Sequence, residues 1–476
     1  MTERTKDKET TSDLNKESET ETQEKLSRRA FAMKSVAAGA AAVTIPGVVY
    51  AGQQSGADTG AVAQPGKSGA AGKVEHLEGT TIPAEYYYKM EHYRKDEAYI
   101  AENWWLLADH VSRVAEPGDF FVFKFGIGES AIVVRNESGE INAFHNVCRH
   151  RGSRLCRHSE APDRDDERVS VKQLGESGSA QVFRCPYHAW MYDLDGNLIK
   201  AYNMSDGFDM TANGLVKCHM LVKDGHIFLN FSRAEEPPPF DDPFSYGFDR
   251  IGGRYRMENL KVGNRKSYQL KANWKLGLEN FMECYHCGPV HNNLVATHNW
   301  DYSLSESRRK RWDDRVADWI GPEMAADRGT GTGGPYDGEL NPGFLTGSID
   351  GTPLAPFLPG IEKWSHDTDI AITYFDTGYW QTYDDHIVVA RFTPRGPEMT
   401  DVEILWLVHP DAEAGKDFDP EKLAELWHIT ILEDAWIVEN NHVGVKSMGY
   451  RPGIYSTNEG EPSNFAAWYM REIVNA

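Results

Sequence analysis

Cysteine is scarce in this chain, with six cysteines among 476 residues. That number is too small for the disulfide scaffold that holds small secreted domains together, so metal ligation or plain burial is the expected role of the cysteines. Long apolar runs are also missing, because the mild apolar stretch at residues 36–50 is too short to span a bilayer as a mature helix. The sequence therefore predicts no stable membrane span, and it contains no internal repeat.

Positive charge is in deficit as well. Lys and Arg together number 50 against 72 Asp and Glu, which gives a formal net charge of -22. This excess disfavours binding to nucleic acid or to an anionic lipid surface, whereas a cationic or neutral small molecule fits better. Hydrophobic residues make up 40% of the chain and can fill substantial cores. The composition indicates a globular enzyme of two or more domains.

The N-terminal region carries the features of an export signal. Residues 1–26 are almost wholly polar and charged and are expected to be disordered. Ser27-Arg28-Arg29-Ala30-Phe31 then precedes the apolar stretch, which ends in small residues. This order resembles a twin-arginine signal within residues 1–51 and predicts a periplasmic protein. A small Ala-rich helix without a targeting role, in a cytoplasmic protein, is the alternative.

Two joints divide the remainder. Residues 52–81 form a flexible linker rich in Gly, Ala, Ser and Gln, and the folded part is expected to begin near Ile82. A second joint at 232–243 contains Glu235-Glu236-Pro237-Pro238-Pro239, which lacks backbone donors and favours extended geometry. The sequence therefore predicts a first folded domain at 82–240 and a second at 241–476.

The two domains are expected to differ in structure, which makes the predicted fold class α+β. The first domain, after an N-terminal helix, should be a small antiparallel β domain, because its β-branched and aromatic runs are separated by turn pairs such as Ser138-Gly139 and Asp195-Gly196. The second should hold a central antiparallel sheet flanked by helices. The predicted strands are 120–125, 131–135, 141–146, 182–184, 227–231, 387–393 and 402–408, and the predicted long helices lie near 272–287 and 421–442.

Two short segments of the first domain each offer one cysteine and one histidine as metal ligands. Cys148 and His150 follow one predicted strand, and Cys185 and His188 follow another. Two loops at the ends of neighbouring strands can hold a binuclear cluster from both sides, with the thiolates on one iron and the imidazoles on the other. The pattern predicts a 2Fe–2S cluster of the Rieske type, which passes electrons singly at moderate potential.

Zinc is the competing metal, because two cysteines and two histidines also form a structural zinc set and would indicate a zinc-stabilised binding module. A zinc finger, however, places both cysteines in one pair and both histidines in the other, whereas each half is mixed here. Cys156 and Cys218 have no ligand-like neighbours and are expected to be packed core thiols.

A second constellation lies in the second domain. Glu283 and His286 are three residues apart and are expected to share a helical face. Gly288-Pro289 should end that helix, so that the chain doubles back and His291 approaches the same point as His286. Two neutral imidazoles and one carboxylate on one face of a metal favour iron(II) with open positions for oxygen. Two ordinary surface histidines are the alternative for such a pair taken alone.

These motifs resemble those of a known family. CRHRG at 148–152, CPYHAW at 185–190 and the segments NWK and ENFMECYH at 273–286 are similar to ring-hydroxylating Rieske non-haem iron oxygenases, over about residues 82–473 of the large subunit. The resemblance implies a 2Fe–2S cluster and a separate mononuclear Fe(II). It implies iron ligands His286, His291 and an acidic residue on a C-terminal helix, namely Asp434 with Glu433 as fallback.

The same resemblance implies partners and a reaction. Glu283 would bridge the catalytic histidine and a cluster histidine of the neighbouring subunit in a head-to-tail ring, commonly a homotrimer. An NAD(P)H-dependent reductase or a ferredoxin would supply electrons for O2 to hydroxylate or dealkylate an aromatic compound or a methylated or quaternary amine. A Glu in the setting ECYHC is closest to choline- and carnitine-type monooxygenases. A non-catalytic Rieske electron-transfer protein is the rival interpretation.

Two regions depart from the pattern or extend it. The gap at 151–184 between the two cluster segments is about twice as long as is usual in the family, and the excess lies in the charged stretch 157–180. A long insertion at a hairpin tip costs little entropy, so it need not disturb the site. Substrate-pocket candidates are Phe281, Met282, Tyr285 and a Gly/Pro-rich stretch at 329–360 that is expected to be a lid without regular structure.

Overall fold

A computed structural model of the chain describes residues 74, 76–157, 173–240, 255–299, 335–364, 370–375 and 377–475. The predicted export signal and most of the predicted linker lie outside the described residues, as does most of the inserted stretch that follows residue 157. Residues 73–476 form one compact unit. None of the helices in the described ranges is long and apolar enough to cross a bilayer.

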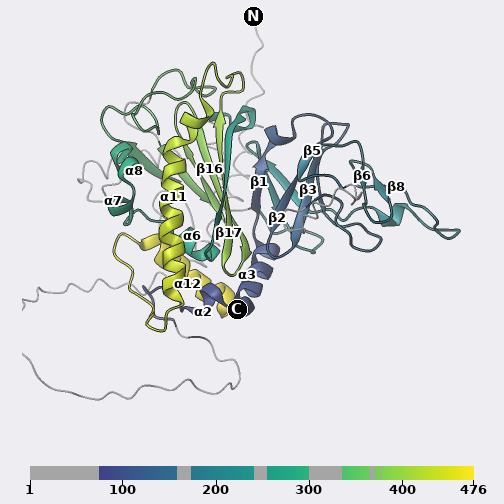
Figure 1. Cartoon of the computed structure of the whole chain (residues 1–476), viewed down its shortest axis with the longest axis horizontal. Coiled ribbons are helices and arrows are strands. Elements are labelled where there is room, and N and C mark those ends of the chain that lie inside the picture. Colours follow the sequence, from purple (N-terminus) through teal and green to yellow (C-terminus); the bar gives the residue numbers. More distant parts are fainter. Residues whose placement is uncertain are drawn as a thin grey trace, which may run out of the picture. The chain divides into compact units, whose positions relative to one another are not determined.

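The first domain follows two helices and consists, within the described ranges, of three antiparallel sheets (Figure 1). The sheet orders are β4-β3-β2-β5, β1-β10-β9 and β6-β7-β8. Tight turns join neighbouring strands at Gly139 and Gly196, whose positive φ angles of 89° and 81° suit a residue without a Cβ. The elements are α2 (Glu85–Tyr88), α3 (Met90–Asn103), β1 (Leu106–His110), β2 (Asp119–Phe125), β3 (Glu129–Arg135), β4 (Ile141–His145), β5 (Ser177–Ser179), β6 (Phe183–Arg184), β7 (Met191–Tyr192), β8 (Leu198–Lys200), β9 (His219–Lys223) and β10 (His226–Asn230).

The second domain is built on an antiparallel sheet that has seven strands in the described part of the chain, in the order β11-β17-β16-β15-β14-β13-β12. The long helix α11 runs along this sheet (Figure 1). The predicted α+β class with a central antiparallel sheet is therefore confirmed. The elements are β11 (Lys261–Leu270), α6 (Trp274–Phe281), α7 (Cys287–Val290), α8 (Asn292–Thr297), β12 (His298–Asn299), β13 (Pro335–Leu340), β14 (Ile370–Phe375), β15 (Gly378–Thr382), β16 (Ile387–Gly396), β17 (Met399–Val408), α11 (Pro420–Val445) and α12 (Gly460–Tyr469).

The start of α11 follows directly from its sequence. Asp419 accepts hydrogen bonds from the backbone N–H groups of Glu421 and Lys422, which have no partner within the helix. Pro420 occupies the first helical position, where its missing N–H costs nothing. Along the helix, Trp427, Ile431, Asp434 and Val438 are all buried, which is the i, i+4, i+7, i+11 spacing of a face turned towards the core. Asp434 is therefore an acidic residue on the apolar face of α11.

The two domains share one hydrophobic core and are joined by a cluster of ion pairs around Asp109, here called the ionic clasp. Phe121 and Phe123 of the first domain belong to the same buried cluster as Val388 and Phe392 of the central sheet. Beside them the buried carboxylate of Asp109 pairs with Arg113 and, at 2.7 Å, with Arg265. Burial alone would raise the pKa of Asp109, but the charges of these arginines hold it at about 2. The clasp fixes β1 of the first domain against β11 of the second.

The predicted helix over residues 272–287 is wrong at its C-terminal end, because α6 stops at Phe281. Glu283 and His286 therefore lie on a turn and do not share a helical face. The carboxylate of Glu283 accepts the backbone N–H groups of Tyr285 and His286, which would otherwise donate to carbonyl groups of the preceding helical turn. Gly288-Pro289 also does not end a helix, since Pro289 lies in the first turn of the short helix α7, where proline is tolerated.

The stretch 329–360 is also more ordered than predicted in its described part. Residues 335–340 form strand β13 in the central sheet. Further along, the Thr346 side chain is fully buried and donates to Asp385 at 2.6 Å, and Leu358 is 1% exposed. The described part of this stretch is thus anchored to the sheet and is not the loose lid expected from its glycines and prolines. Residues 329–334 lie outside the described residues.

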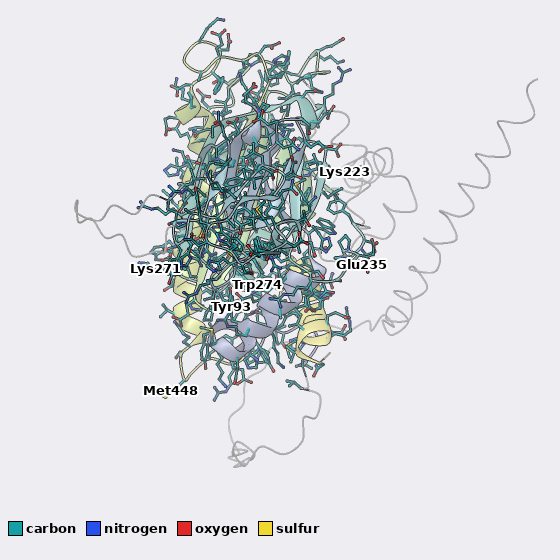
Figure 2. The ribbon with its side chains drawn as sticks, turned by 90° about the vertical axis from the view of Figure 1, so that its right-hand side faces the viewer. Tyr93, Lys223, Glu235, Lys271, Trp274 and Met448 are labelled. Carbon is teal, nitrogen blue, oxygen red and sulfur yellow. A yellow bond between two sulfur atoms is a disulfide. The ribbon has the colours of Figure 1, made fainter. Side chains whose placement is uncertain are left out.

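A buried ion pair anchors α6. Lys275 and Asp96 both have side chains with no exposed surface, and they lie 2.5 Å apart. Asp96 also accepts hydrogen bonds from Trp274 and Tyr469, so that it joins helices α3, α6 and the end of α12. Figure 2 shows Trp274 within the packed interior and Met448, 98% exposed, at the edge of the molecule. Because a buried charge is tolerable only when it is paired, this network fixes the helix that leads into the turn carrying Glu283 and His286.

Replacing Asp96 by Ala should lower the free energy of unfolding by about 3–5 kcal/mol, because the Lys275 ammonium group then stays buried without its carboxylate. The double variant Asp96→Ala/Lys275→Met should recover most of that loss. Urea unfolding followed by tryptophan fluorescence measures both. An unchanged urea midpoint for Asp96→Ala would contradict the structural role of the pair.

Candidate metal centres

The two predicted cluster segments fold into matching loops. In the first, the N–H of Gly152 donates to the carbonyl of Cys148 at 3.0 Å, and in the second the N–H of Ala189 donates to that of Cys185 at 3.1 Å. The residue four positions after each cysteine has a positive φ, 74° for Gly152 and 59° for Ala189. Each cysteine N–H also donates to the carbonyl five residues on, in Ser153 and Trp190. One backbone turn is therefore used twice, and it holds a cysteine and a histidine each time.

The four candidate cluster ligands converge. Both cysteine side chains are buried, and the Nδ1 atoms of His150 and His188 face one another at 3.1 Å. Burial raises the pKa of Cys148, while Tyr192, whose hydroxyl lies 3.2 Å from the sulfur, and the N–H of His150 act in the opposite direction. The two sulfurs lie inside, the two imidazoles lie at the surface, and hydrogen-bond donors point at sulfur. This arrangement fits a 2Fe–2S cluster whose histidine-ligated iron faces outward.

The two ends of the inserted stretch are hydrogen-bonded to each other. Cys156 pairs with Leu174 in a β-bridge, and the N–H of Arg157 donates to the carbonyl of Leu174 at 2.6 Å. Because the ends of the insertion meet, its length does not pull the two cluster loops apart. Cys156 and Cys218 are buried free thiols, as predicted.

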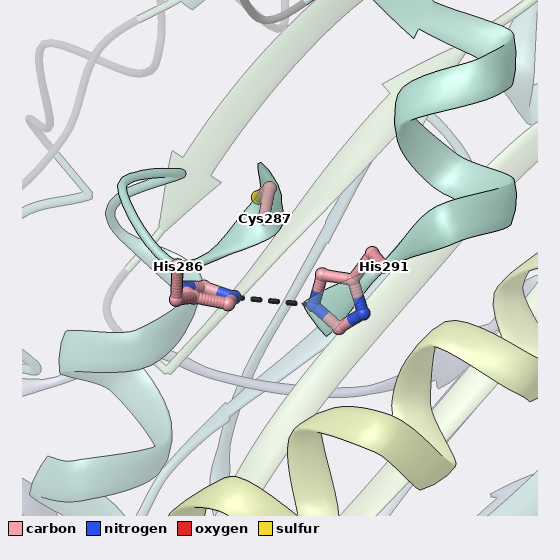
Figure 3. A group of neighbouring side chains, drawn as sticks. All are labelled: His286, Cys287 and His291. Atoms are coloured by element: carbon pink, nitrogen blue, oxygen red, sulfur yellow. Dashed lines mark hydrogen bonds between the residues drawn. The ribbon is translucent and has the colours of Figure 1, made fainter. Parts of the chain in front are cut away.

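The second centre brings together His286, His291 and Asp434. The two Nε2 atoms lie 3.2 Å apart, as the dashed line in Figure 3 shows. Asp434 Oδ1 lies 3.2 Å from His286 Nε2 and 2.9 Å from His291 Nε2. His291 is 1% and Asp434 5% exposed, so the three atoms form a small triangle at the inner side of the turn.

Two other carboxylates set the orientation of the histidines. Glu283 Oε1 accepts from His286 Nδ1 at 2.5 Å, and Glu433 Oε2 accepts from His291 Nδ1 at 2.8 Å. A carboxylate accepts only, so each Nδ1 carries the proton and each Nε2 is left for a metal. The carboxylate of Glu433 is therefore hydrogen-bonded to the far nitrogen of the His291 ring. Of Glu433 and Asp434, only Asp434 places an oxygen beside both Nε2 atoms.

The triangle fits a metal ion bound on one face. Two ligands at right angles around an ion with bonds of about 2.1 Å lie about 3.0 Å apart, which matches the three distances. Burial alone would lower the pKa of His286, but hydrogen bonds to Asp434 and Glu283 raise it to about 9. The carboxylates that raise this pKa would also favour a bound cation, whose binding competes with protonation of the imidazole.

Sequence reasoning missed a disulfide in this turn. Cys284 and Cys287 are bonded to each other, and they enclose His286. The sulfur of Cys287 lies within 4.8 Å of ligand atoms of His286 and His291, but a disulfide sulfur is not a thiolate and cannot replace Asp434 as the third ligand. The spacing Cys-x-x-Cys was the available signal for this bond.

Aromatic side chains occupy the same segments as the candidate iron ligands. Phe281, at the end of α6, packs against Tyr379 at 5.6 Å and Phe392 at 4.6 Å between ring centroids. Tyr379 packs in turn against Trp427 at 6.1 Å, two turns before Asp434 on α11. Of the predicted pocket residues, Phe281 and Met282 pack against the core, whereas Tyr285 is 58% exposed and points away from it.

Comparison with known proteins gives the family. The Rieske 2Fe–2S domain matches residues 104–218, and the catalytic domain of ring-hydroxylating α subunits matches residues 257–474. The glycine betaine monooxygenase oxygenase subunit of Chromohalobacter salexigens is 32% identical over 409 residues, covering 83% of this chain and 86% of that protein. The carnitine monooxygenase oxygenase subunit of Escherichia coli K12 is 31% identical over 220 residues, covering 45% of this chain and 53% of that protein.

Solved structures share the fold. The quaternary ammonium Rieske monooxygenase CntA in complex with L-carnitine has a TM-score of 0.60 at 21% identity, covering 83% of this chain and 96% of that one. Naphthalene 1,2-dioxygenase from Rhodococcus sp. has a TM-score of 0.54 at 18% identity, covering 82% of this chain and 94% of that one. A catalytic domain beside the cluster domain rules out the electron carrier and the zinc module as interpretations. The chain belongs to the Rieske non-haem iron oxygenases, as an oxygenase α subunit with a 2Fe–2S cluster and a mononuclear iron.

Proposed function

We propose that this oxygenase oxidises a small quaternary ammonium compound at a carbon bonded to nitrogen. The observation that carries the proposal is the similarity to a glycine betaine monooxygenase subunit over 83% of the chain. One oxygen atom of O2 enters a C–H bond, and the other leaves as water after two electrons and two protons are added. If the carbon is an N-methyl group, the hydroxymethyl product then releases formaldehyde and a tertiary amine.

Aromatic rings on the segments that carry the candidate iron ligands are consistent with a cationic substrate. Phe281, Tyr379 and Trp427 form a continuous series of ring contacts from α6 through β15 to α11. Ring faces attract quaternary ammonium groups by about 0.5–2 kcal/mol each, without a charged partner. The strongly acidic chain, with a formal charge of -22, favours the approach of a cation over that of an anion.

The protein's own residues provide positions for this chemistry. His286, His291 and Asp434 would hold the mononuclear iron, and Cys148, Cys185, His150 and His188 would hold the cluster. When bound, these metals supply electron storage and O2 activation. Glu283 and Glu433 keep both histidines in the tautomer that presents Nε2, and the buried position of Asp434 keeps bulk water from its carboxylate.

We further propose a head-to-tail homotrimer in which Glu283 carries electrons between subunits. Among the described residues, the hydrogen bonds of the cluster loops stay inside the first domain, and none reaches the turn that carries Glu283. A path through a neighbouring subunit would supply the missing connection. A separate NAD(P)H-dependent reductase or ferredoxin would charge the cluster.

The composition of two surfaces supports such a trimer. Around the cluster, Tyr187 is 56% exposed, and Arg149, Arg151 and Arg184 are exposed. Beside the candidate iron ligands, an apolar groove of about 510 Å³ lies between α7 and α11, with the carboxylate of Glu433 in its lining and Trp436, 68% exposed, at its wall. Apolar and basic groups on one side and apolar and acidic groups on the other favour pairing of these two faces.

Oxygen uptake with defined substrates tests the proposed activity. Purified protein with a reductase should consume O2 with glycine betaine or carnitine and form a hydroxylated or demethylated product, and it should do so much more slowly with salicylate or benzoate. His286→Ala should retain the visible absorbance of the cluster and lose product formation, because one of three iron ligands is gone. Faster turnover of an aromatic acid would overturn the quaternary ammonium assignment.

Glu283 and Glu433 form a matched pair for testing the electron path. Both accept from a histidine Nδ1, so Glu283→Gln and Glu433→Gln should each weaken iron binding by about 10–100-fold. With iron restored to saturation, only Glu283→Gln should remain slow in single-turnover oxidation of the reduced cluster by O2 and substrate. Equal rates for the two iron-saturated variants would contradict the bridging role.

We propose export by the twin-arginine route, on the basis of Arg28 and Arg29 before the apolar stretch. Cells that express the full chain should contain the protein in the periplasmic fraction. Cells that express Arg28→Lys/Arg29→Lys should retain it in the cytoplasm with its cluster, because the four candidate cluster ligands lie between residues 148 and 188, outside the signal. A cytoplasmic wild-type protein would refute export.

A further inference from the structure

The disulfide between Cys284 and Cys287 encloses an iron ligand. The bonded pair spans Tyr285 and His286, and Glu283 directly precedes it. The Glu283 carboxylate accepts the N–H groups of the two enclosed residues and also the Nδ1–H of His286. The disulfide and the carboxylate therefore constrain the same four-residue turn, and the position of His286 Nε2 depends on both.

The turn is open to reagents on one side and closed on the other. Cys284 is partly exposed and its neighbour Tyr285 is 58% exposed, whereas Cys287 is 3% exposed. Of the two cysteines, Cys284 is therefore the one that an attacking thiolate would meet, with Cys287 released as the inner thiol. This arrangement is typical of a disulfide that can be exchanged, and it differs from the two isolated core thiols, Cys156 and Cys218.

The sulfur of Cys287 has a second set of neighbours. The Cys287 sulfur, one nitrogen of His286 and one nitrogen of His291 lie within 4.8 Å of one another. Figure 3 shows these three side chains. A free Cys287 thiolate would add a sulfur donor beside the two imidazoles, whose Nε2 atoms lie 2.9–3.2 Å from the carboxylate of Asp434. Four donors that include sulfur suit tetrahedral zinc, whereas three N/O donors with open positions suit iron(II) that reacts with O2.

We propose that the Cys284–Cys287 disulfide is a reversible bond that decides which metal the catalytic site holds. This proposal rests on the proposed iron site of His286, His291 and Asp434. Closed, the bond keeps a thiolate away from the iron. Opened by a dithiol, it yields two cysteine thiols while the dithiol becomes a disulfide, a two-electron exchange with two protons carried over. Cys287 then becomes the fourth donor, and the site takes zinc and stops reacting with O2.

Two single variants separate the role of the bond from the role of the thiol. Cys284→Ser and Cys287→Ser both abolish the disulfide, but only Cys284→Ser leaves a thiol beside the two histidines. Each full-length protein, with its cluster in place, is freed of mononuclear iron with a chelator and titrated with Zn²⁺. Cys284→Ser should bind zinc about tenfold or more tightly than Cys287→Ser and the oxidised wild-type protein.

Cobalt gives a readout independent of activity. Co²⁺ bound to Cys284→Ser should show thiolate-to-cobalt charge transfer in the difference spectrum, and Co²⁺ bound to Cys287→Ser should not. Cluster absorbance reports that each variant is folded. Equal zinc affinities with no charge-transfer band in either variant would overturn the proposal, as would equal thiol counts for denatured wild type with and without prior reduction. Substrate-dependent O2 uptake of the oxidised wild type tests the proposed function separately.

Discussion

The hydrogen bonds from His286 and His291 to Glu283 and Glu433 are the interactions on which the catalytic centre depends. Each glutamate fixes the proton of one imidazole on Nδ1, so that both Nε2 atoms face Asp434 Oδ1 at 2.9–3.2 Å. Without them the rings could rotate or exchange tautomers, and the three-atom triangle would be lost. Three carboxylates thus surround two histidines, but only one of them occupies the metal's side.

Glu283 has three tasks that follow from its position. Its carboxylate takes the backbone N–H groups of Tyr285 and His286, which ends α6 at Phe281, and it orients the His286 ring. A turn in place of a continued helix brings His286 and His291 to one point although they are five positions apart in the sequence. The proposed electron transfer through Glu283 would add a third task to a residue that the local structure already requires.

The sequence predicted those features that depend on a few neighbouring residues. The cluster loops could be predicted because each contains a Cys, a His and then a residue at positive φ in a fixed order. Gly152 indicates that backbone geometry in the first loop. The end of α6 could not be predicted, because a side chain outcompetes the helix for two N–H groups. The choice between Asp434 and Glu433 depends on which face of α11 is turned towards the core. The sequence holds that information, because Asp434 falls on the same helical face as the apolar residues Trp427, Ile431 and Val438. The disulfide was not predicted, because so few cysteines in a chain of this length favour metal ligation or burial over disulfide bonding.

A chain with two separate iron centres should contain about three iron atoms and about two acid-labile sulfides, because the cluster holds two irons and the His286–His291–Asp434 site holds one. Iron, zinc and sulfide analysis of the purified, fully loaded protein measures this directly. A content near three irons and two sulfides per chain agrees with the account. Two irons per chain at saturation, or zinc without sulfide, would contradict it.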